Sequence, residues 1–208
     1  MKDLPRIALF GGTFDPVHLG HTGVSGYVAS HLHADCVIFI PAGHPPLKPS
    51  APKASGIDRL NMVQLAIADN PIWQASDCEL HRTGPSYTID TVRHFRGTYG
   101  REAILYWLIG ADCVHDLPSW YQIEQLLREC TIVTMTRPGW PRPDFRIFEH
   151  LWPASLIRQL QEYVVQTPMI DISSSLIRSR IRSGQDVSSL LHPAVLDYIR
   201  QHRLYLEP

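Results

Sequence analysis

Short apolar runs alternate with helical patterns along most of this chain. Residues 7–10, 36–40, 103–109 and 131–136 are apolar or β-branched at nearly every position, not at every second one. Strands buried on both faces have this pattern, and they occur in parallel sheets that are covered by helices on both sides. We therefore expect an α/β fold with a doubly wound parallel sheet, formed by a single domain over residues 1–208.

Further elements follow from the same periodicities. We expect helices over residues 19–33, 58–69, 156–165 and 173–183, others beginning near 88, 123 and 193, and strands over 73–80 and 168–172. Residues 41–55 hold five prolines and should form a loop. Apart from its expected helix, the proline-broken segment 137–167 carries no motif that predicts a function.

Composition excludes several classes of protein. The 208 residues are 44% hydrophobic and 19% charged, which is typical of a globular chain and not of a disordered one. A formal net charge of −1 gives no general attraction to nucleic acid or to anionic membranes. The four scattered cysteines suggest reduced thiols, and no apolar run resembles a signal peptide or a membrane span, so we expect a cytoplasmic protein. The sequence leaves its assembly open, a homo-oligomer included.

The segment from residue 7 to residue 21 predicts an anion site. An apolar strand ends in Gly11 and Gly12, and a loop then leads to His18 and His21 at the start of a helical pattern. The first N–H groups of a helix have no partners within it, and the helix dipole favours negative charge there. The motif is neither G-x-G-x-x-G nor a P-loop. A metal-binding histidine pair and an ordinary turn are the alternatives.

A second segment, Ile172-Ser-Ser-Ser-Leu-Ile-Arg178, again places the end of an apolar run before a helix. Serine hydroxyls cap free N–H groups there, leaving other N–H groups for phosphate oxygens, and the planar guanidinium of Arg178 suits phosphate. A capped amphipathic helix with solvated arginines is the alternative.

Together the two segments resemble the nucleotidylyltransferase superfamily, whose motifs are His-x-Gly-His and Ile-Ser-Ser-Thr-x-Ile-Arg. Ser175 replaces the usual threonine and keeps its hydroxyl. The resemblance implies a Rossmann-like fold, ATP as a substrate, and Mg²⁺ held mainly through the ATP phosphates instead of by a protein metal site. The catalytic residues it implies are His18, His21 and Arg178. The ATP-binding residues it implies are Gly11, Gly12, Thr13, Phe14, His18, His21, Gly110, Asp112, Arg137, Ser173, Ser174, Ser175 and Arg178.

The resemblance extends over nearly the whole chain and is strongest to the bacterial nicotinate-nucleotide adenylyltransferases, through residues 84–88, 110–112 and 118–121. It implies that Trp120 stacks on the pyridine ring while N–H groups near Tyr87, Thr88 and Tyr121 hold the carboxylate. The mononucleotide-binding residues it implies are Asp15, Lys48, Ser86, Tyr87, Thr88, Trp120 and Tyr121. Taken singly, the aromatic residues are equally typical of a core, and Ser86–Thr88 and Asp112 of helix caps. Leu47 departs from the Pro-Pro-His of many relatives, although His44 is near.

The reaction implied joins ATP and nicotinate mononucleotide to give deamido-NAD and pyrophosphate. Adenylyltransferases that use nicotinamide mononucleotide or phosphopantetheine are alternatives, as is a nucleotide-binding regulator without catalysis. An aminoacyl-tRNA synthetase, which has a related His-x-Gly-His core, is excluded by the short length and the neutral charge.

Overall fold

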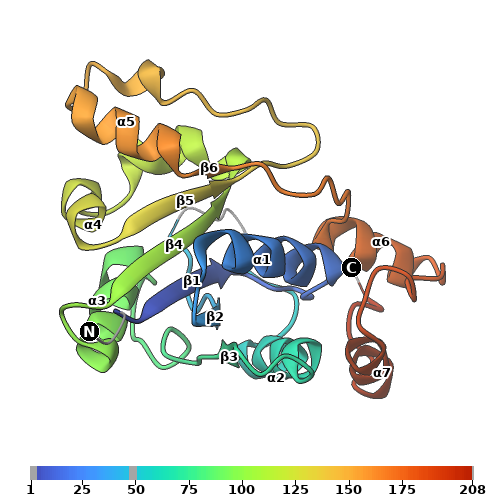
Figure 1. Cartoon of the computed structure of the whole chain (residues 1–208). Coiled ribbons are helices and arrows are strands. Elements are labelled where there is room, and N and C mark those ends of the chain that lie inside the picture. The colour runs from blue at the N-terminus through green and yellow to red at the C-terminus, as the bar shows by residue number, and fades with distance from the viewer. Residues whose placement is uncertain (1–3, 47–50, 208) are drawn as a thin grey trace.

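The computed structural model describes residues 4–46 and 51–207. Within these residues, six parallel strands form a sheet of order β3-β2-β1-β4-β5-β6 (Figure 1). The strands are β1 (Arg6–Gly12), β2 (Cys36–Pro41), β3 (Trp73–Ala75), β4 (Ile104–Gly110), β5 (Thr131–Met135) and β6 (Val164–Val165). The helices are α1 (Leu19–Leu32), α2 (Gly56–Ile67), α3 (Thr88–Tyr99), α4 (Ile123–Glu129), α5 (Ala154–Glu162), α6 (Ser174–Arg182) and α7 (Pro193–Gln201), with 3-10 helices η1 (Ala111–Ser119) and η2 (Phe145–Phe148).

Strand β1 lies at the point where the strand order reverses. From β1 the chain proceeds to β2 and β3 on one side, and then returns to build β4, β5 and β6 on the other. Ile7 pairs with Cys36 of β2 and with Leu105 of β4, so both neighbours run parallel to β1. In open α/β sheets, ligands bind beyond the carboxyl ends of the strands at such a reversal. The loop that follows β1 is therefore in the favoured place for a site.

Helices cover both faces of the sheet, as the continuous apolar strands predict. Successive side chains of a strand point to opposite faces, and Ala8 and Phe10 belong to one core cluster while Ile7 and Leu9 belong to the other. The first cluster includes buried residues of α1, α2, α6 and α7, and the second includes those of α3, α4 and α5. The doubly wound α/β fold is confirmed.

Three expected elements differ from the structure. The strand expected over 73–80 ends at Ala75, and the chain turns where the N–H of Leu80 donates to the Asp77 carbonyl. The helix expected over 156–165 ends at Glu162, because the next residues form β6 and pair with β5. The strand expected over 168–172 is wrong.

Local hydrogen bonds explain that last error. The N–H groups of Ile170 and Ile172 donate to carbonyls only two residues earlier, those of Pro168 and Ile170, so they do not extend a ladder. Pro168 itself has no N–H to contribute to one. The apolar run 168–172 instead leads from β6 towards the start of α6.

Cys36, Cys78 and Cys130 are free thiols. Burial raises the pKa of Cys130 to about 12, so this thiol stays protonated in the second core cluster. Among the described residues, no helix combines the length and the apolar character needed to cross a membrane.

The close approach of β1 to β4 gives a test of the packing. A Cβ at Gly11 would lie 2.6 Å from the Trp107 ring, which itself is buried. We expect Gly11→Ala to lower the free energy of unfolding by about 1–3 kcal/mol through overpacking, measured by urea denaturation. Gly97→Ala is the matched control, because nothing lies within 4 Å of its Cβ position in α3. That variant should be neutral or more stable, and equal losses in both variants would contradict the packing described.

Candidate active site

The loop between β1 and α1 folds tightly against the sheet. A Cβ at Gly12 would lie 2.9 Å from the ring of Phe14, whose backbone is left-handed with φ of 50°. The Phe14 ring is buried and packs edge-on against His21 with centroids 5.1 Å apart. Phe14 therefore serves the core with its side chain, and only its backbone is left for the ATP contact that the sequence predicts.

His18 and His21 form a stacked pair at the start of α1. Their ring centroids are 3.7 Å apart with 27° between the planes. The N–H of His18, the N-cap residue, donates to Nδ1 of His21 at 3.2 Å. A Cβ at Gly20 would lie 2.9 Å from Nδ1 of His18, so the glycine between the two histidines makes room for the His18 ring.

Both imidazoles are neutral at physiological pH. Burial, with a smaller effect from the charge of Arg137, lowers the pKa of His18 to about 4. Burial also lowers the pKa of His21 well below its usual value, with further effects from His18 and Arg137. Because Nδ1 of His21 accepts a hydrogen bond, its neutral ring carries the proton on Nε2. His21 is thus a fixed hydrogen-bond donor without a net charge.

Residues that follow β4 and β5 lie next to each other at the same edge. Arg137 donates from Nη1 to Oδ2 of Asp112 at 2.7 Å. The Asp112 carboxylate folds back over Gly110, where a Cβ would overlap it. Asp112 is therefore an ion-pair partner rather than the N-cap of η1, which begins after Gly110. Arg137 lies near enough for its charge to lower the pKa of both histidines.

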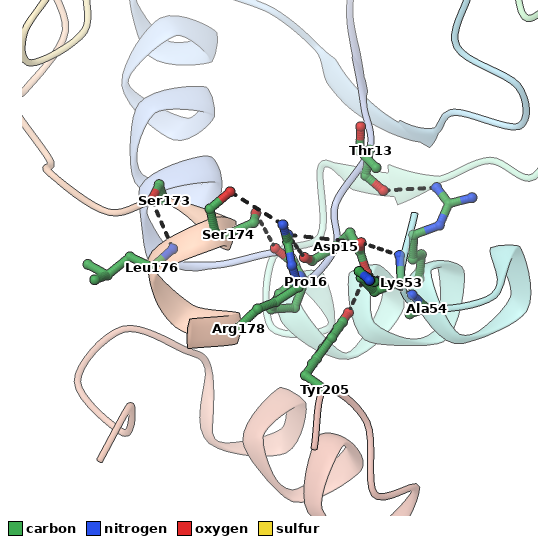
Figure 2. A network of polar contacts seen from close by, with 12 residues as sticks. Thr13, Asp15, Pro16, Lys53, Ala54, Ser173, Ser174, Leu176, Arg178 and Tyr205 are labelled. Carbon is green, nitrogen blue, oxygen red and sulfur yellow. Dashed lines mark hydrogen bonds and ion pairs between the residues drawn. The ribbon is translucent and has the colours of Figure 1, made fainter. Parts of the chain in front are cut away.

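The start of α6 packs on the same loop, although it is more than 150 residues away in sequence (Figure 2). The Ser174 hydroxyl donates to the carbonyl of Pro16 at 2.9 Å, and Nη1 of Arg178 donates to the carbonyl of Asp15 at 2.7 Å. Ser173 caps the helix by accepting from the N–H of Leu176 at 3.2 Å. The structure thus brings together the two motifs that the sequence singles out.

The three serine hydroxyls already have partners in the chain. Ser173 caps α6, Ser174 bonds Pro16, and Ser175 accepts from Nη2 of Arg178 at 3.3 Å. Their place at the outer phosphates of ATP stays a prediction, and the helix-start N–H groups are the donors best suited to it.

Asp15 is bonded to other parts of the chain. Its side chain is buried, and its carboxylate accepts hydrogen bonds from the N–H groups of Lys53 and Ala54 and from the Tyr205 hydroxyl. The carboxylate thus binds other parts of the chain. A contact from Asp15 to nicotinate mononucleotide is untested and stays a prediction.

The residues expected at the pyridine ring gather beyond β2 and at the start of α3. The rings of Tyr87 and Tyr121 stack with centroids 4.2 Å apart, and Tyr121 is 50% exposed. Tyr87 is the N-cap of α3 but its side chain makes no capping bond, and Thr88 is the first residue of the helix. The half-buried Trp120 packs against the second core cluster. Aromatic faces and free helix-start N–H groups are therefore close neighbours in the chain.

A short loop after β2 connects the two halves of the site. The N–H of Ala42 donates to the carbonyl of Gly12, next to the loop that leads to the two histidines. Two residues later, His44 donates from its N–H to the Ser86 hydroxyl at 3.0 Å and accepts from the Ser86 N–H at 2.9 Å. Ser86 is therefore a structural link rather than a helix cap. Lys48 and Leu47 lie outside the described residues.

Three buried polar residues have roles that no motif indicates. Arg59 donates from Nη1 to the Thr13 carbonyl at 2.8 Å, and Glu79 accepts from the Thr91 hydroxyl at 2.6 Å. Burial raises the pKa of Glu79, while its hydrogen bonds and Arg82 oppose that rise. Tyr205 bonds to Asp15. The sequence gives a weak indication for Arg59: a charged residue stands in the apolar stripe of α2, one turn before Met62 and Val63.

The part of the chain that the structure describes contains no cluster of side chains of the kind that holds a metal ion. No three histidine, cysteine, aspartate or glutamate side chains there lie close enough together to hold an ion. The cationic side chains Arg137 and Arg178 and the helix starts suit an anionic ligand.

Comparison with known proteins identifies the family. A model of the family described as cytidylyltransferase-like matches residues 9–180. The chain is 42% identical over 204 residues to a probable nicotinate-nucleotide adenylyltransferase from Synechococcus sp. (strain JA-2-3B'a(2-13)), covering 98% of both chains. It is 38% identical over 200 residues to a protein of the same description from Dehalococcoides mccartyi (strain CBDB1), covering 96% of this chain and 97% of that one.

Solved structures share the fold. The nicotinic acid mononucleotide adenylyltransferase of Plasmodium falciparum, complexed with NaAD, superposes with a TM-score of 0.75 at 20% identity, covering 97% of each chain. A putative nicotinate-nucleotide adenylyltransferase of Vibrio parahaemolyticus gives a TM-score of 0.67 at 21% identity over 99% of this chain and 98% of that one. At such identities the likeness supports the architecture alone.

The neutral state of His18 predicts how stability depends on pH. Its folded pKa of about 4 lies below the usual value of 6.5, so between these values the unfolded chain binds a proton that the folded protein does not. The free energy of unfolding should therefore fall as the pH falls from about 6.5 to about 4. Wild type should lose about 1 kcal/mol more per pH unit than His18→Gln, measured by urea denaturation.

The exposed His115 provides the control, since His115→Gln changes a ring that stays in water. The pH dependence of this variant should follow that of the wild type. Parallel curves for wild type and His18→Gln would contradict the buried, neutral state of His18.

Proposed function

This chain belongs to the cytidylyltransferase-like family, and from that premise we propose how it transfers the adenylyl group of ATP to nicotinate mononucleotide. The products are deamido-NAD and pyrophosphate, which makes the protein a nicotinate-nucleotide adenylyltransferase of NAD biosynthesis. One observation carries the proposed mechanism: two helix starts, with His18 and His21 on one and Arg178 on the other, meet at the carboxyl end of β1.

The phosphate of nicotinate mononucleotide is the nucleophile. A phosphate monoester has its second pKa near 6, so at neutral pH it is already largely a dianion and needs no general base. Attack on the α-phosphorus of ATP forms one P–O bond while the bond to the bridging oxygen of the β-phosphate breaks, and pyrophosphate leaves with that electron pair. The protein has to align the two phosphates and stabilise the charge that develops.

His21 is suited to stabilise the charge that develops during the transfer. Its ring is fixed by the bond from the His18 N–H and by contact with Phe14, so the Nε2–H group is held in one direction. A preorganised neutral donor stabilises an oxygen that gains charge without reorganising during the reaction. His18, stacked on the same ring, is proposed to act on a neighbouring phosphoryl oxygen.

The start of α6 suits the departing pyrophosphate. Arg178 uses Nη1 and Nη2 for bonds to Asp15 and Ser175, and its remaining N–H donors are available to phosphate oxygens. Mg²⁺ is proposed to enter as the ATP complex, since the described residues build no cation cage. The pair Asp112–Arg137 lies where the ribose and the α-phosphate of ATP are proposed to bind.

The acceptor is proposed to bind at the loop that contains Ser86 and at the start of α3. Trp120 is proposed to stack on the flat pyridine ring, and N–H groups of the first turn of α3 suit its carboxylate. We also propose a cytoplasmic location, which the sequence analysis predicts. Assembly as a homo-oligomer, which the sequence leaves open, is proposed with it.

The choice of acceptor is testable by pyrophosphate release. With Mg²⁺ and ATP, we expect turnover with nicotinate mononucleotide at least about tenfold faster than with nicotinamide mononucleotide, because the amide lacks the charge that helix-start N–H groups favour. Phosphopantetheine should give none. Release with phosphopantetheine alone would contradict the proposal, and preference for the amide would contradict the acceptor site.

The role of His21 is testable within α1. His21→Ala should lower kcat by about 100-fold or more, the scale of losing one preorganised donor. His31→Ala, at the exposed end of the same helix, is the matched control and should retain activity. Circular dichroism of both variants checks the fold, and normal turnover by a folded His21→Ala protein would contradict the mechanism.

A further inference from the structure

The C-terminal segment returns to the phosphate-binding end of the molecule. After α7 the chain passes beside α6 (Figure 1), and Tyr205 is 8% exposed. Its hydroxyl donates to Oδ1 of Asp15 at 2.8 Å (Figure 2). The two residues are 190 positions apart, so this bond closes the C-terminal segment onto the β1–α1 loop.

Asp15 gathers donors from three other parts of the chain. The N–H of Lys53 donates to Oδ2 at 2.7 Å, and that of Ala54 to Oδ1 at 3.0 Å. Nη1 of Arg178 lies 3.9 Å from Oδ2. Together with Tyr205, these groups surround a buried carboxylate whose desolvation makes each donor important.

The backbone of the same loop holds α6. The carbonyl of Asp15 accepts from Nη1 of Arg178, and the next carbonyl, that of Pro16, accepts from the Ser174 hydroxyl. The orientation of residues 15 and 16 therefore sets where the Arg178 guanidinium lies. A shift of the Asp15 side chain would move these carbonyls and with them the group that faces the pyrophosphate.

Tyr205 remains a donor under all ordinary conditions. Burial and the nearby Asp15 carboxylate raise the pKa of its phenol, so it does not ionise. Without the hydroxyl, Oδ1 of Asp15 would keep only the Ala54 N–H among its described hydrogen-bond donors. A buried carboxylate oxygen that loses a donor is costly, and rearrangement towards Arg178 is the available response.

We propose that Tyr205 is a positioning residue for adenylyl transfer, which holds Asp15 so that Arg178 is directed at the triphosphate. The inference rests on the proposed function, in which Arg178 holds the departing pyrophosphate. It assigns a task in the reaction to the C-terminal segment, which touches neither reacting phosphorus. Tyr205 acts on the ATP half of the site through Arg178, whereas Tyr87 and Trp120 of the acceptor half lie on other elements.

Tyr205→Phe tests this, with Tyr198→Phe as the matched control. The Tyr198 hydroxyl also donates to a carboxylate, Asp58, at 2.9 Å and accepts from Asn61, but it does so between α7 and α2. Both variants remove one hydroxyl that donates to a carboxylate in the C-terminal region, so Tyr198→Phe controls for the loss of one long-range hydrogen bond.

Only Tyr205→Phe should change the use of ATP. We expect its kcat/KM for ATP to fall about tenfold or more, a larger change than that of KM for nicotinate mononucleotide. Tyr198→Phe should keep both values within about twofold of wild type. Calorimetric binding of a non-hydrolysable ATP analogue with Mg²⁺ should show the same contrast between the variants without turnover.

A double mutant tests whether Tyr205 acts through Arg178. In an Arg178→Ala background, adding Tyr205→Phe should cost less than about twofold in kcat/KM for ATP, because the group that it positions is gone. Additive losses, or equal effects of Tyr205→Phe and Tyr198→Phe, would overturn the inference. An inactive wild type would overturn the proposed function instead, and the analogue-binding contrast would still decide the role of Tyr205.

Discussion

The buried carboxylate of Asp15 is the interaction on which the phosphate-binding end of this molecule depends. A carboxylate out of water needs hydrogen-bond donors, and here they come from residues 53–54 and from Tyr205, while the Arg178 guanidinium lies 3.9 Å away as an ion-pair partner. These bonds hold the C-terminal segment and the loop before α2 to the loop after β1, whose backbone carbonyls at Asp15 and Pro16 hold α6. The same loop leads into α1 and places His18 and His21 at the start of that helix. The hydrogen bonds that the buried carboxylate needs therefore help to hold together the segments that are proposed to bind ATP.

The site is made of neutral donors beside a few cations. Burial keeps His18 and His21 uncharged, so the positive charge available to a triphosphate comes from arginines. The two imidazoles are fixed by stacking and by the bond from the His18 N–H. Unlike the flexible side chain of a cation, a fixed donor stabilises a phosphoryl oxygen in one position only. This division suits a reaction in which ATP arrives with Mg²⁺ and needs alignment more than additional charge.

The sequence predicted much of this. Continuous apolar runs identified β1, β2, β4 and β5, because strands buried on both faces leave an unambiguous pattern. The sequence does not predict the short β6, because a two-residue strand has no periodicity and residues 168–172 resemble a strand better. His18, His21 and Arg178 were found as motif residues, and the structure brings their segments together.

What the sequence did not indicate were contacts fixed only by the tertiary fold. Tyr205 is one of several tyrosines in the chain, and nothing local marks it as a partner of Asp15. Ser86 and Asp112 looked like helix caps as readily as site residues, and only the structure shows that one bonds His44 and the other Arg137. Local pattern predicts elements and helix starts, whereas long-range hydrogen bonds depend on how the elements pack.

The most direct test of adenylyl transfer follows the phosphates of ATP. Wild-type protein is incubated with Mg²⁺, nicotinate mononucleotide and ATP that is radiolabelled at either the α- or the γ-phosphate, and the products are separated by chromatography. The account predicts that the α-label appears only in deamido-NAD and the γ-label only in pyrophosphate. Transfer of the γ-label to the mononucleotide, or release of γ-labelled inorganic phosphate as the primary product, would contradict it.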